Sequence, residues 1–200
     1  MAGLACAGLR SALAGPFSFT LAAGGVIAVS GPSGAGKSLF LRMIADLDPN
    51  QGEVTLNGTP RGQIPAPEWR RRVAYLPAES GWWRPMVAAH FLPGADAAPL
   101  AARLCLDPAL IAGPVARLSS GEKSRMALIR ALLGTPDVLL LDEPTGALDP
   151  IATEAVEALL AERRAEGVAM IVVTHDPAQA ERLGGRRIRL VDRRFAETPA

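Results

Sequence analysis

A glycine-rich segment followed by a lysine and a serine is the first feature of this sequence that could perform chemistry. Its residues are Gly31, Pro32, Ser33, Gly34, Ala35, Gly36, Lys37 and Ser38. Glycines let consecutive backbone N–H groups converge on phosphate oxygens, and a following helix directs its positive end at the same anion. Lys37 would neutralise the β- and γ-phosphates, and Ser38 would ligate Mg²⁺. A chance glycine turn is the alternative, but an apolar run precedes the segment and a helical pattern follows it, which favours a nucleoside triphosphate site.

Two adjacent acids follow a second apolar run, at residues 138–141. Such a run is typical of a central parallel strand, which would deliver Asp142 to its carboxyl end beside the phosphate-binding loop. Asp142 is predicted to hold the Mg²⁺ shell, and Glu143 to orient or deprotonate the attacking water. Acids at this position can instead cap a helix. With the phosphate-binding loop in the same chain, we expect the catalytic role.

Five elements, in this order along the chain, resemble the ABC ATPase family. They are the phosphate-binding loop, Leu118-Ser119-Ser120-Gly121-Glu122, the acidic strand, Ala147-Leu148-Asp149, and Thr174-His175-Asp176. The second is similar to the family signature, with Ser120 and Glu122 in place of a glycine and a glutamine. The last two resemble the D-loop and the switch histidine. A histidine at a strand end can also be purely structural, but the surrounding motif favours a functional His175.

The resemblance implies a head-to-tail homodimer or pseudo-dimer in which two ATPase subunits sandwich each ATP. The phosphate-binding loop of one subunit would face Ser119 and Gly121 of the other, with Asp149 nearby, and His175 would contact the γ-phosphate and the water. A helix beginning at the signature would form a second anion site. One chain could not fold both anion sites onto one γ-phosphate if they lie on different faces.

Two positions depart from the family pattern. Ala78 stands where the family usually has a glutamine that touches Mg²⁺ and water, and the adjacent Glu79 or a water could replace that ligand. The family also stacks an aromatic ring on the adenine from an N-terminal loop, but residues 9–13 contain no aromatic side chain. Nucleotide binding is therefore expected, while the source of adenine recognition stays open.

Strands alternating with helices predict an α/β fold: a P-loop NTPase core with a mostly parallel sheet, an N-terminal antiparallel β subdomain and a small helical subdomain. The expected strands are 17–21, 26–30, 73–76, 138–141, 168–174 and 187–191, with a hairpin at 51–60. The expected helices are 37–47, 150–166, one capped by Ser119 or Ser120 that runs to Leu133, and a short one between the last two strands. We expect one domain over residues 1–200, with the helical subdomain at about 81–133.

Bulk properties restrict the possible partners. The chain has 200 residues and a formal net charge of +1, which gives no electrostatic argument for nucleic acid. Residues 11–36 carry no charge, which raises the question of a membrane span. Glycine and proline pairs interrupt this stretch, so we expect a soluble chain without a membrane span. Transmembrane permease subunits would then be separate chains, and this chain would be cytoplasmic, on the inner face of the membrane.

The tryptophans leave a choice open. Trp82 and Trp83 either face a membrane partner or fill the core of the helical subdomain. Three other functions also stay open. A translation or repair ABC protein would usually carry two cassettes or a coiled-coil insertion, and another P-loop enzyme such as a kinase would lack the signature. A nucleotide sensor without turnover is favoured mildly by Ala78 but opposed by Glu143 and His175.

Overall fold

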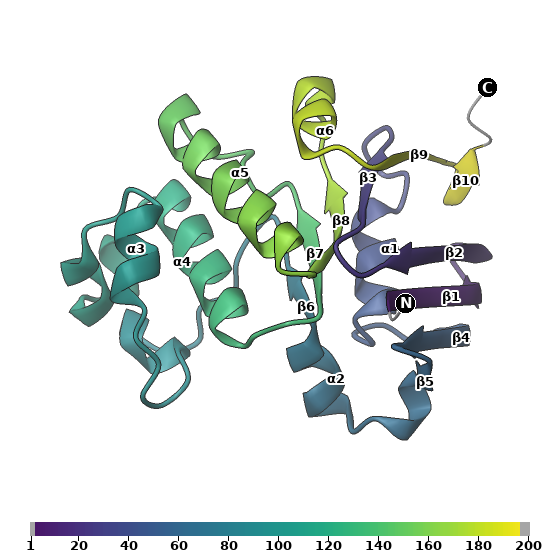
Figure 1. The fold of residues 1–200 in the computed structure, drawn as a ribbon, viewed down its shortest axis with the longest axis horizontal. Helices are drawn as coiled ribbons and strands as arrows, with labels where there is room; N and C mark the ends of the chain where they lie inside the picture. Colours follow the sequence, from purple (N-terminus) through teal and green to yellow (C-terminus); the bar gives the residue numbers. More distant parts are fainter. Residues whose placement is uncertain (1–2, 197–200) are drawn as a thin grey trace.

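The computed structural model describes residues 3–196, which form two β-sheets and a helical region (Figure 1). The smaller sheet is antiparallel, in the order β2 (Phe17–Ala22), β1 (Gly3–Arg10), β4 (Gln51–Leu56) and β5 (Thr59–Pro60). The larger sheet has the order β10 (Arg194–Ala196), β9 (Arg186–Val191), β3 (Val26–Ser30), β8 (Ala169–Val173), β7 (Val138–Asp142) and β6 (Val73–Leu76). All neighbours in it are parallel except β10 and β9. The predicted fold class is confirmed.

The helices surround the larger sheet and extend to one side of it. They are α1 (Lys37–Ile44), α2 (Ala66–Arg72), α3 (Ala98–Arg103), α4 (Ser120–Leu133), α5 (Pro150–Ala165) and α6 (Pro177–Leu183). Short 3₁₀ turns at Arg61–Gln63, Val87–His90, Pro108–Ala112 and Val115–Arg117 connect them. Figure 1 places α3 and α4 at one end of the molecule and the antiparallel sheet at the other. Within residues 3–196, no helix is both long and apolar enough to cross a bilayer.

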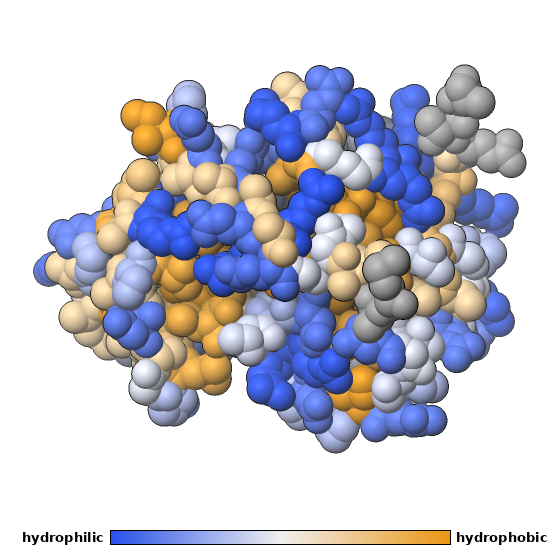
Figure 2. Space-filling view, in the orientation of Figure 1, coloured by the Kyte–Doolittle hydropathy of each residue, from blue (hydrophilic) through white to orange (hydrophobic). Residues whose placement is uncertain are grey.

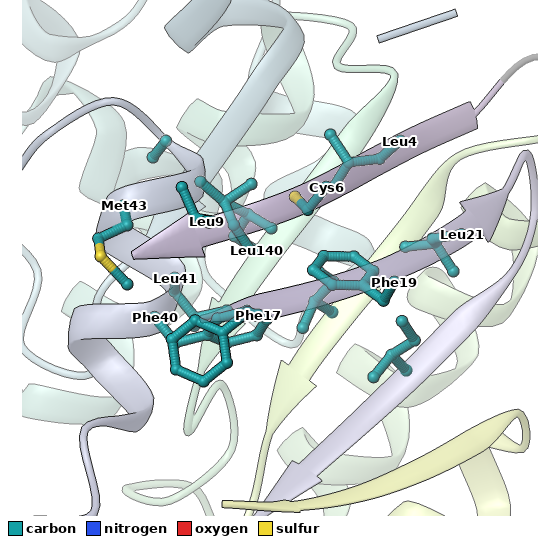
Figure 3. Packing of buried hydrophobic residues seen from close by; sticks show 14 of the residues in the cluster. Leu4, Cys6, Leu9, Phe17, Phe19, Leu21, Phe40, Leu41, Met43 and Leu140 are labelled. Atoms are coloured by element: carbon teal, nitrogen blue, oxygen red, sulfur yellow. The ribbon is translucent and has the colours of Figure 1, made fainter. Parts of the chain in front are cut away.

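Two hydrophobic clusters share the central strands. Every residue of β7 and β8 is buried, as expected for strands with both faces covered. Successive side chains of a strand point to opposite faces, so Leu140 and Ile171 join one cluster while Leu141 and Val172 join the other. The first cluster also contains Phe17, Phe19 and Leu4 of the antiparallel sheet and Phe40 of α1 (Figure 3). The second packs α4 and α5 against the sheet.

The first helix ends three residues earlier than the sequence predicted. The prediction ran to residue 47, but α1 ends at Ile44 and Asp46 has a left-handed φ of 58°. The Arg61 guanidinium donates to the Met43 carbonyl over 2.9 Å, and the Asn50 amide donates to the same oxygen over 3.3 Å. The same carbonyl also accepts from Asp46 N–H over 3.2 Å, and the Arg42 carbonyl accepts from Leu47 N–H over 2.9 Å. A local left-handed turn therefore ends the helix, and the side chains of Arg61 and Asn50 add to it.

The three tryptophans differ in how far they are buried. Trp69 of α2 is fully buried in the first cluster, and its indole Nε1 donates to the Ile44 carbonyl over 3.0 Å. Trp83 is 68% exposed. Trp82 lies between these extremes, packed against the second cluster. Trp82 therefore takes part in the packing of the helical region, whereas Trp83 lies at the surface, where a partner contact stays a prediction.

Candidate functional site

The phosphate-binding loop connects β3 to α1. Gly36 lies at the N-terminus of α1 with a left-handed φ of 91°, and a Cβ at Gly31 would come within 2.2 Å of the Leu190 carbonyl oxygen. Glycine is required at both positions, for the backbone conformation and for the close approach to β9. The loop can therefore keep its backbone N–H groups around one point at the start of the helix.

Lys37 is held inside this loop. Only 8% of the residue is exposed, and its ammonium donates to the carbonyl oxygens of Gly31 over 2.8 Å and Pro32 over 3.1 Å. A buried ammonium needs such partners because an unpaired buried charge is strongly disfavoured. The same ammonium is in position to exchange these carbonyls for phosphate oxygens, which are stronger acceptors because they are charged.

A cavity of about 430 Å³ opens in front of the loop. Residues that the sequence places far apart line it together: Ser33 to Ser38 of the loop, Leu39, Ala78, Asp142, Glu143, His175, Leu13 and Arg193. The parallel strands β3, β6, β7 and β8 all point their carboxyl ends toward it, which is where open α/β sheets bind ligands. Both predicted acids and the predicted histidine thus share a cavity with the phosphate-binding loop.

Asp142 ends the buried strand β7 and is 4% exposed. The Tyr75 hydroxyl of β6 donates to its Oδ2 over 3.2 Å. Burial, reinforced by the nearby Asp142 charge, raises the pKa of Tyr75 well above its usual range, so the tyrosine stays a neutral donor. Ser38 and Asp142 bring a hydroxyl and a carboxylate to one cavity, and these hard oxygen donors are of the kind that Mg²⁺ prefers.

Glu143 has an unusual backbone conformation. Its φ is 51°, in the left-handed region that non-glycine residues rarely adopt. Its N–H donates to the Val173 carbonyl at the end of β8 over 3.0 Å, and its carbonyl accepts from Gly146 N–H over 3.2 Å. Strain of this kind costs about 1–3 kcal/mol and is concentrated at functional sites. The conformation directs the carboxylate into the cavity, beside the residues of the neighbouring strand.

The Glu143 carboxylate lies against His175. Glu143 Oε1 is 3.0 Å from His175 Nε2, and Oε2 accepts from the His175 N–H over 3.4 Å. Among the residues that the structure describes, buried Oε1 accepts no hydrogen bond, although His175 Nε2 is its close neighbour. Burial raises the pKa of Glu143, while His175 opposes the shift. A half-buried carboxylate with a raised pKa, placed in the cavity, is suited to accept a proton from water.

The signature residues are positioned by the start of α4. Ser119 Oγ accepts from Glu122 N–H over 3.3 Å, and the Glu122 carboxylate accepts from Ser119 N–H over 2.7 Å, which forms a capping box. These hydrogen bonds hold the pKa of Glu122 below its usual range. The residue that replaces the family glutamine therefore caps its own helix, a local role that the sequence analysis did not predict.

The signature also contacts the D-loop segment of the same chain. A Cβ at Gly121 would lie 3.2 Å from the Ala147 carbonyl oxygen and 3.3 Å from Leu148 Cδ2. Asp149 caps α5, where its Oδ1 accepts from Ala152 N–H over 2.9 Å. Within residues 3–196, neither Ser119, Gly121 nor Asp149 lines the cavity of the phosphate-binding loop. The structure thus brings together one group of predicted site residues and places the signature group elsewhere.

The cavity and the side chains next to it include residues that the sequence analysis discussed and others that it missed. Ala78 lines it, at the position expected for the missing glutamine, whereas the exposed Glu79 is not one of its lining residues in the described chain. Tyr75, Leu13 and Arg193 were not predicted to belong to the site. The signal available for Leu13 and Arg193 was the absence of an aromatic residue at positions 9–13, which indicates that other side chains would contact a nucleobase.

The comparisons with known proteins agree with this geometry. The family model described as "ABC transporter" matches residues 15–146. "Protein STAR1" of Oryza sativa subsp. japonica is 37% identical over 172 residues, which cover 80% of this chain and 50% of that protein. "Lipoprotein-releasing system ATP-binding protein LolD 1" of Rhodospirillum rubrum is 37% identical over 181 residues, covering 80% of this chain and 79% of that protein. The chain therefore spans about half the length of the rice relative and more of the bacterial one.

A solved structure shows the shared fold. It is an ATP-binding cassette described as a dimer in a post-hydrolysis state bound to ADP and Pi. Its TM-score to this chain is 0.85 at 23% sequence identity, and the match covers 97% of both chains. The family model covers more than half of the chain, and the phosphate-binding loop, the acidic strand end and the signature all lie within the residues that it matches. The chain belongs to the ABC transporter family.

Proposed function

We propose that this chain binds and hydrolyses MgATP and thereby drives transport through separate membrane-spanning subunits. The observation that carries the proposal is the meeting of Lys37, Asp142, Glu143 and His175 in one cavity at the carboxyl ends of the parallel strands. A cation for phosphate oxygens, a ligand for a hard metal and a base for water are the parts that phosphoryl transfer to water needs. The name of the Rhodospirillum rubrum relative, which describes the ATP-binding protein of a lipoprotein-releasing system, supports the same proposal.

The roles of the chain's own residues follow from their geometry. The loop N–H groups and Lys37 hold the phosphates, while Glu143 accepts the proton of the attacking water. The His175 backbone N–H orients that carboxylate through its hydrogen bond to Oε2, and the His175 ring would donate toward the γ-phosphate from a protonated Nε2. Ser38 and Asp142 would hold Mg²⁺, which supplies positive charge against the phosphate oxygens. Hydrolysis then proceeds by in-line attack of water, with ADP as the leaving group.

Removal of the metal tests this proposal directly. The chain is expected to release phosphate from MgATP, and excess EDTA is expected to abolish the release, because Ser38 and Asp142 supply only part of an octahedral shell and cannot replace the ion. Release of phosphate is measured with ATP alone, with MgATP, and with MgATP plus EDTA. Turnover that is unaffected by EDTA would contradict the metal assignment, and no turnover in any condition would favour a nucleotide sensor.

We further propose that the working unit is a dimer of such cassettes. The cavity lacks a contribution from the signature of its own chain, so a second subunit would have to supply Ser119 and Gly121. Ile151, which is 72% exposed in the first turn of α5 two residues after Asp149, would lie at that contact, since the preceding Ala147 and Leu148 adjoin the signature. The dimeric cassette with the same fold is consistent with this arrangement.

The membrane partner is proposed to dock on the helical region near Trp83. Trp83, Met86 and Leu92 are all exposed, and the Trp83 ring lies against the His90 ring, with 4.7 Å between the ring centroids. His90 Nε2 accepts from the N–H groups of Trp83 and Arg84 over 3.0 Å each, and the Arg130 guanidinium lies 5.0 Å from both tryptophan ring centroids. A rigid, exposed aromatic ring is typical of a residue that anchors a partner. Figure 2 shows apolar surface reaching solvent at the helical end of the molecule, near α4.

Trp82 and Trp83 form a matched pair for testing this surface. Trp83→Ala is expected to weaken association with the permease subunits by about 2 kcal/mol, as for an aromatic hot spot, and to leave stability unchanged. Trp82→Ala is expected to lower the melting temperature, because its ring packs against the second cluster. Co-purification of the permease and thermal unfolding are measured for both variants. A Trp83→Ala variant that unfolds early, with its partner affinity intact, would assign that ring to the fold.

A further inference from the structure

The cavity in front of the phosphate-binding loop has two chemically different parts. Lys37, Asp142, Glu143 and His175 form the part that suits phosphates, metal and water. Leu13, from the loop between β1 and β2, and Arg193, from the turn between β9 and β10, also line the cavity but have no role in that chemistry. Because a nucleotide carries a flat base at the end opposite its γ-phosphate, these two residues call for a separate explanation.

Arg193 occupies a position where another residue type would be expected. The register of β9 and β10 pairs Val191 with Arg194, so Asp192 and Arg193 form a two-residue turn. Their φ angles are 47° and 61°, and such turns usually contain Asn-Gly or Asp-Gly because glycine adopts a positive φ without strain. Arginine at the second position accepts strain that glycine would avoid. An observed strain of this kind points to a function of the side chain.

Both ends of Arg193 are fixed to the loop that carries Leu13. The Arg193 carbonyl accepts from Gly15 N–H over 2.9 Å, and its guanidinium Nη1 donates to the Leu13 carbonyl over 3.3 Å. The side-chain stem rests on the phosphate-binding loop, since a Cβ at Gly36 would lie 3.2 Å from Arg193 Cγ and 3.6 Å from Arg193 Cβ. Arg193 therefore bridges the phosphate-binding loop and the Leu13 loop, and its guanidinium is held at the latter.

The direction of this hydrogen bond leaves the flat surface of the guanidinium available. All five guanidinium donors lie in the plane of the group, so a bond through Nη1 uses an edge and neither face. Guanidinium faces stack on aromatic rings, and Leu13, 60% exposed, offers an apolar side chain beside the group. Among the described residues that line the cavity there is no aromatic ring. Lys37, by contrast, is anchored at Gly31 and Pro32, at the phosphate end.

We propose that Arg193, together with Leu13, forms the surface on which the nucleobase stacks. The inference rests on the proposed nucleotide-binding function and assigns its base subsite. Stacking on a guanidinium face uses the π-system that every base has, and it reads no donor or acceptor at the base edge. The site is therefore expected to bind MgATP and MgGTP with comparable affinity.

The test compares a ligand that has a base with one that has none. Dissociation constants for MgATP and for Mg-tripolyphosphate are measured by calorimetry for the wild type, Arg193→Ala, Arg193→Lys and Arg194→Ala. Arg193→Ala is expected to weaken MgATP binding about three- to thirtyfold, the range for a cation stacked on a ring, and to leave tripolyphosphate binding unchanged. Arg193→Lys keeps the charge without the plane and is expected to recover little. Arg194→Ala removes the neighbouring exposed arginine, which does not line the cavity, and serves as the matched control.

A second variant separates stacking from loosening of the turn. Adding Leu13→Trp to Arg193→Ala supplies a different flat surface at the same end of the cavity and is expected to restore MgATP affinity. Equal loss of both ligands in Arg193→Ala would make Arg193 a phosphate contact and overturn the proposal, as would MgATP binding that no variant changes. If the wild type binds Mg-tripolyphosphate as tightly as MgATP, the base adds no affinity and only this inference fails. If it binds neither ligand, the proposed function fails with it.

Discussion

Replacing Glu143 by glutamine is expected to slow MgATP hydrolysis by about 10²–10⁴-fold while leaving MgATP binding close to that of the wild type, because only the base is lost. Glutamine keeps the size of the side chain and an acceptor oxygen near His175 Nε2, but it cannot take a proton from water. A nucleotide that is bound and not hydrolysed would hold two cassettes together. The variant is therefore expected to form a MgATP-dependent dimer, which size-exclusion chromatography would detect.

The pH dependence of the same reaction gives an independent check. Burial raises the pKa of Glu143, and the group must be deprotonated to act as a base. The acid limb of kcat/KM should therefore lie above the ordinary glutamate pKa of about 4.3, with activity falling as pH drops through the raised value. The residual activity of Glu143→Gln should lack that limb.

The control for this variant is an exposed glutamate on the far end of α5. Glu162→Gln breaks a surface ion pair with Arg103 and is expected to hydrolyse MgATP at the wild-type rate. A Glu143→Gln variant that hydrolyses MgATP as fast as Glu162→Gln would remove Glu143 from the mechanism. Retained turnover without dimer formation in Glu143→Gln would count against both the base and the sandwich. Stalled turnover in a monomer would leave the base intact and assign dimerisation to the membrane subunits.

Replacing Lys37 by alanine is expected to have the second large effect, on binding. A charge-assisted hydrogen bond to phosphate contributes about 1.5–3 kcal/mol, so the Kd for MgATP should rise roughly ten- to a hundredfold, with a matching loss of turnover at low ATP. The structure adds a complication, because the Lys37 ammonium also bonds two carbonyls of the loop. Lys37→Met keeps the length of the side chain and should show the same loss if the charge is what matters.

Calorimetry of MgATP binding and thermal unfolding without nucleotide separate the two effects. Arg103→Ala deletes a positive charge from the same surface pair as the Glu162 control and should change neither quantity by much. Wild-type affinity in Lys37→Met would disprove the phosphate role of the lysine. Lost affinity in Lys37→Ala alone, accompanied by a lower melting temperature, would point to disruption of the loop.

Some parts of the structure carried too little local signal to be predicted. Strand β1 consists largely of glycine, alanine and cysteine besides its leucines, so its apolar pattern is weak, and it is stabilised by pairing with both β2 and β4. Helix α2 contains one buried side chain, Trp69, and three arginines, which leaves hardly any amphipathic period. Strand β10 has three residues. In each case partners distant in the sequence supply the stability, and no local pattern records them.

The sequence by itself determined the family, the fold class and the order of the chemical groups. Phosphate binding depends on a contiguous run in which glycines, Lys37 and Ser38 have fixed spacing, and an apolar strand delivers Asp142 and Glu143 to its own end. Both are local facts, because one short segment positions all the atoms concerned. The boundaries of β3 and β6 were predictable for the same reason, and the cap of α4 was narrowed to Ser119 or Ser120, of which the structure has Ser119.

Only the tertiary structure decided which distant residues share the cavity. Arg193 follows Leu13 by 180 residues, yet the Arg193 guanidinium on the β9–β10 turn donates to the Leu13 carbonyl in the β1–β2 loop over 3.3 Å. The strain at Glu143 and its approach to His175 likewise arise because β7 and β8 are neighbours, which their sequence order does not state. Contacts of this kind depend on strand order and loop packing, so chemistry that uses them becomes visible only once the chain is folded.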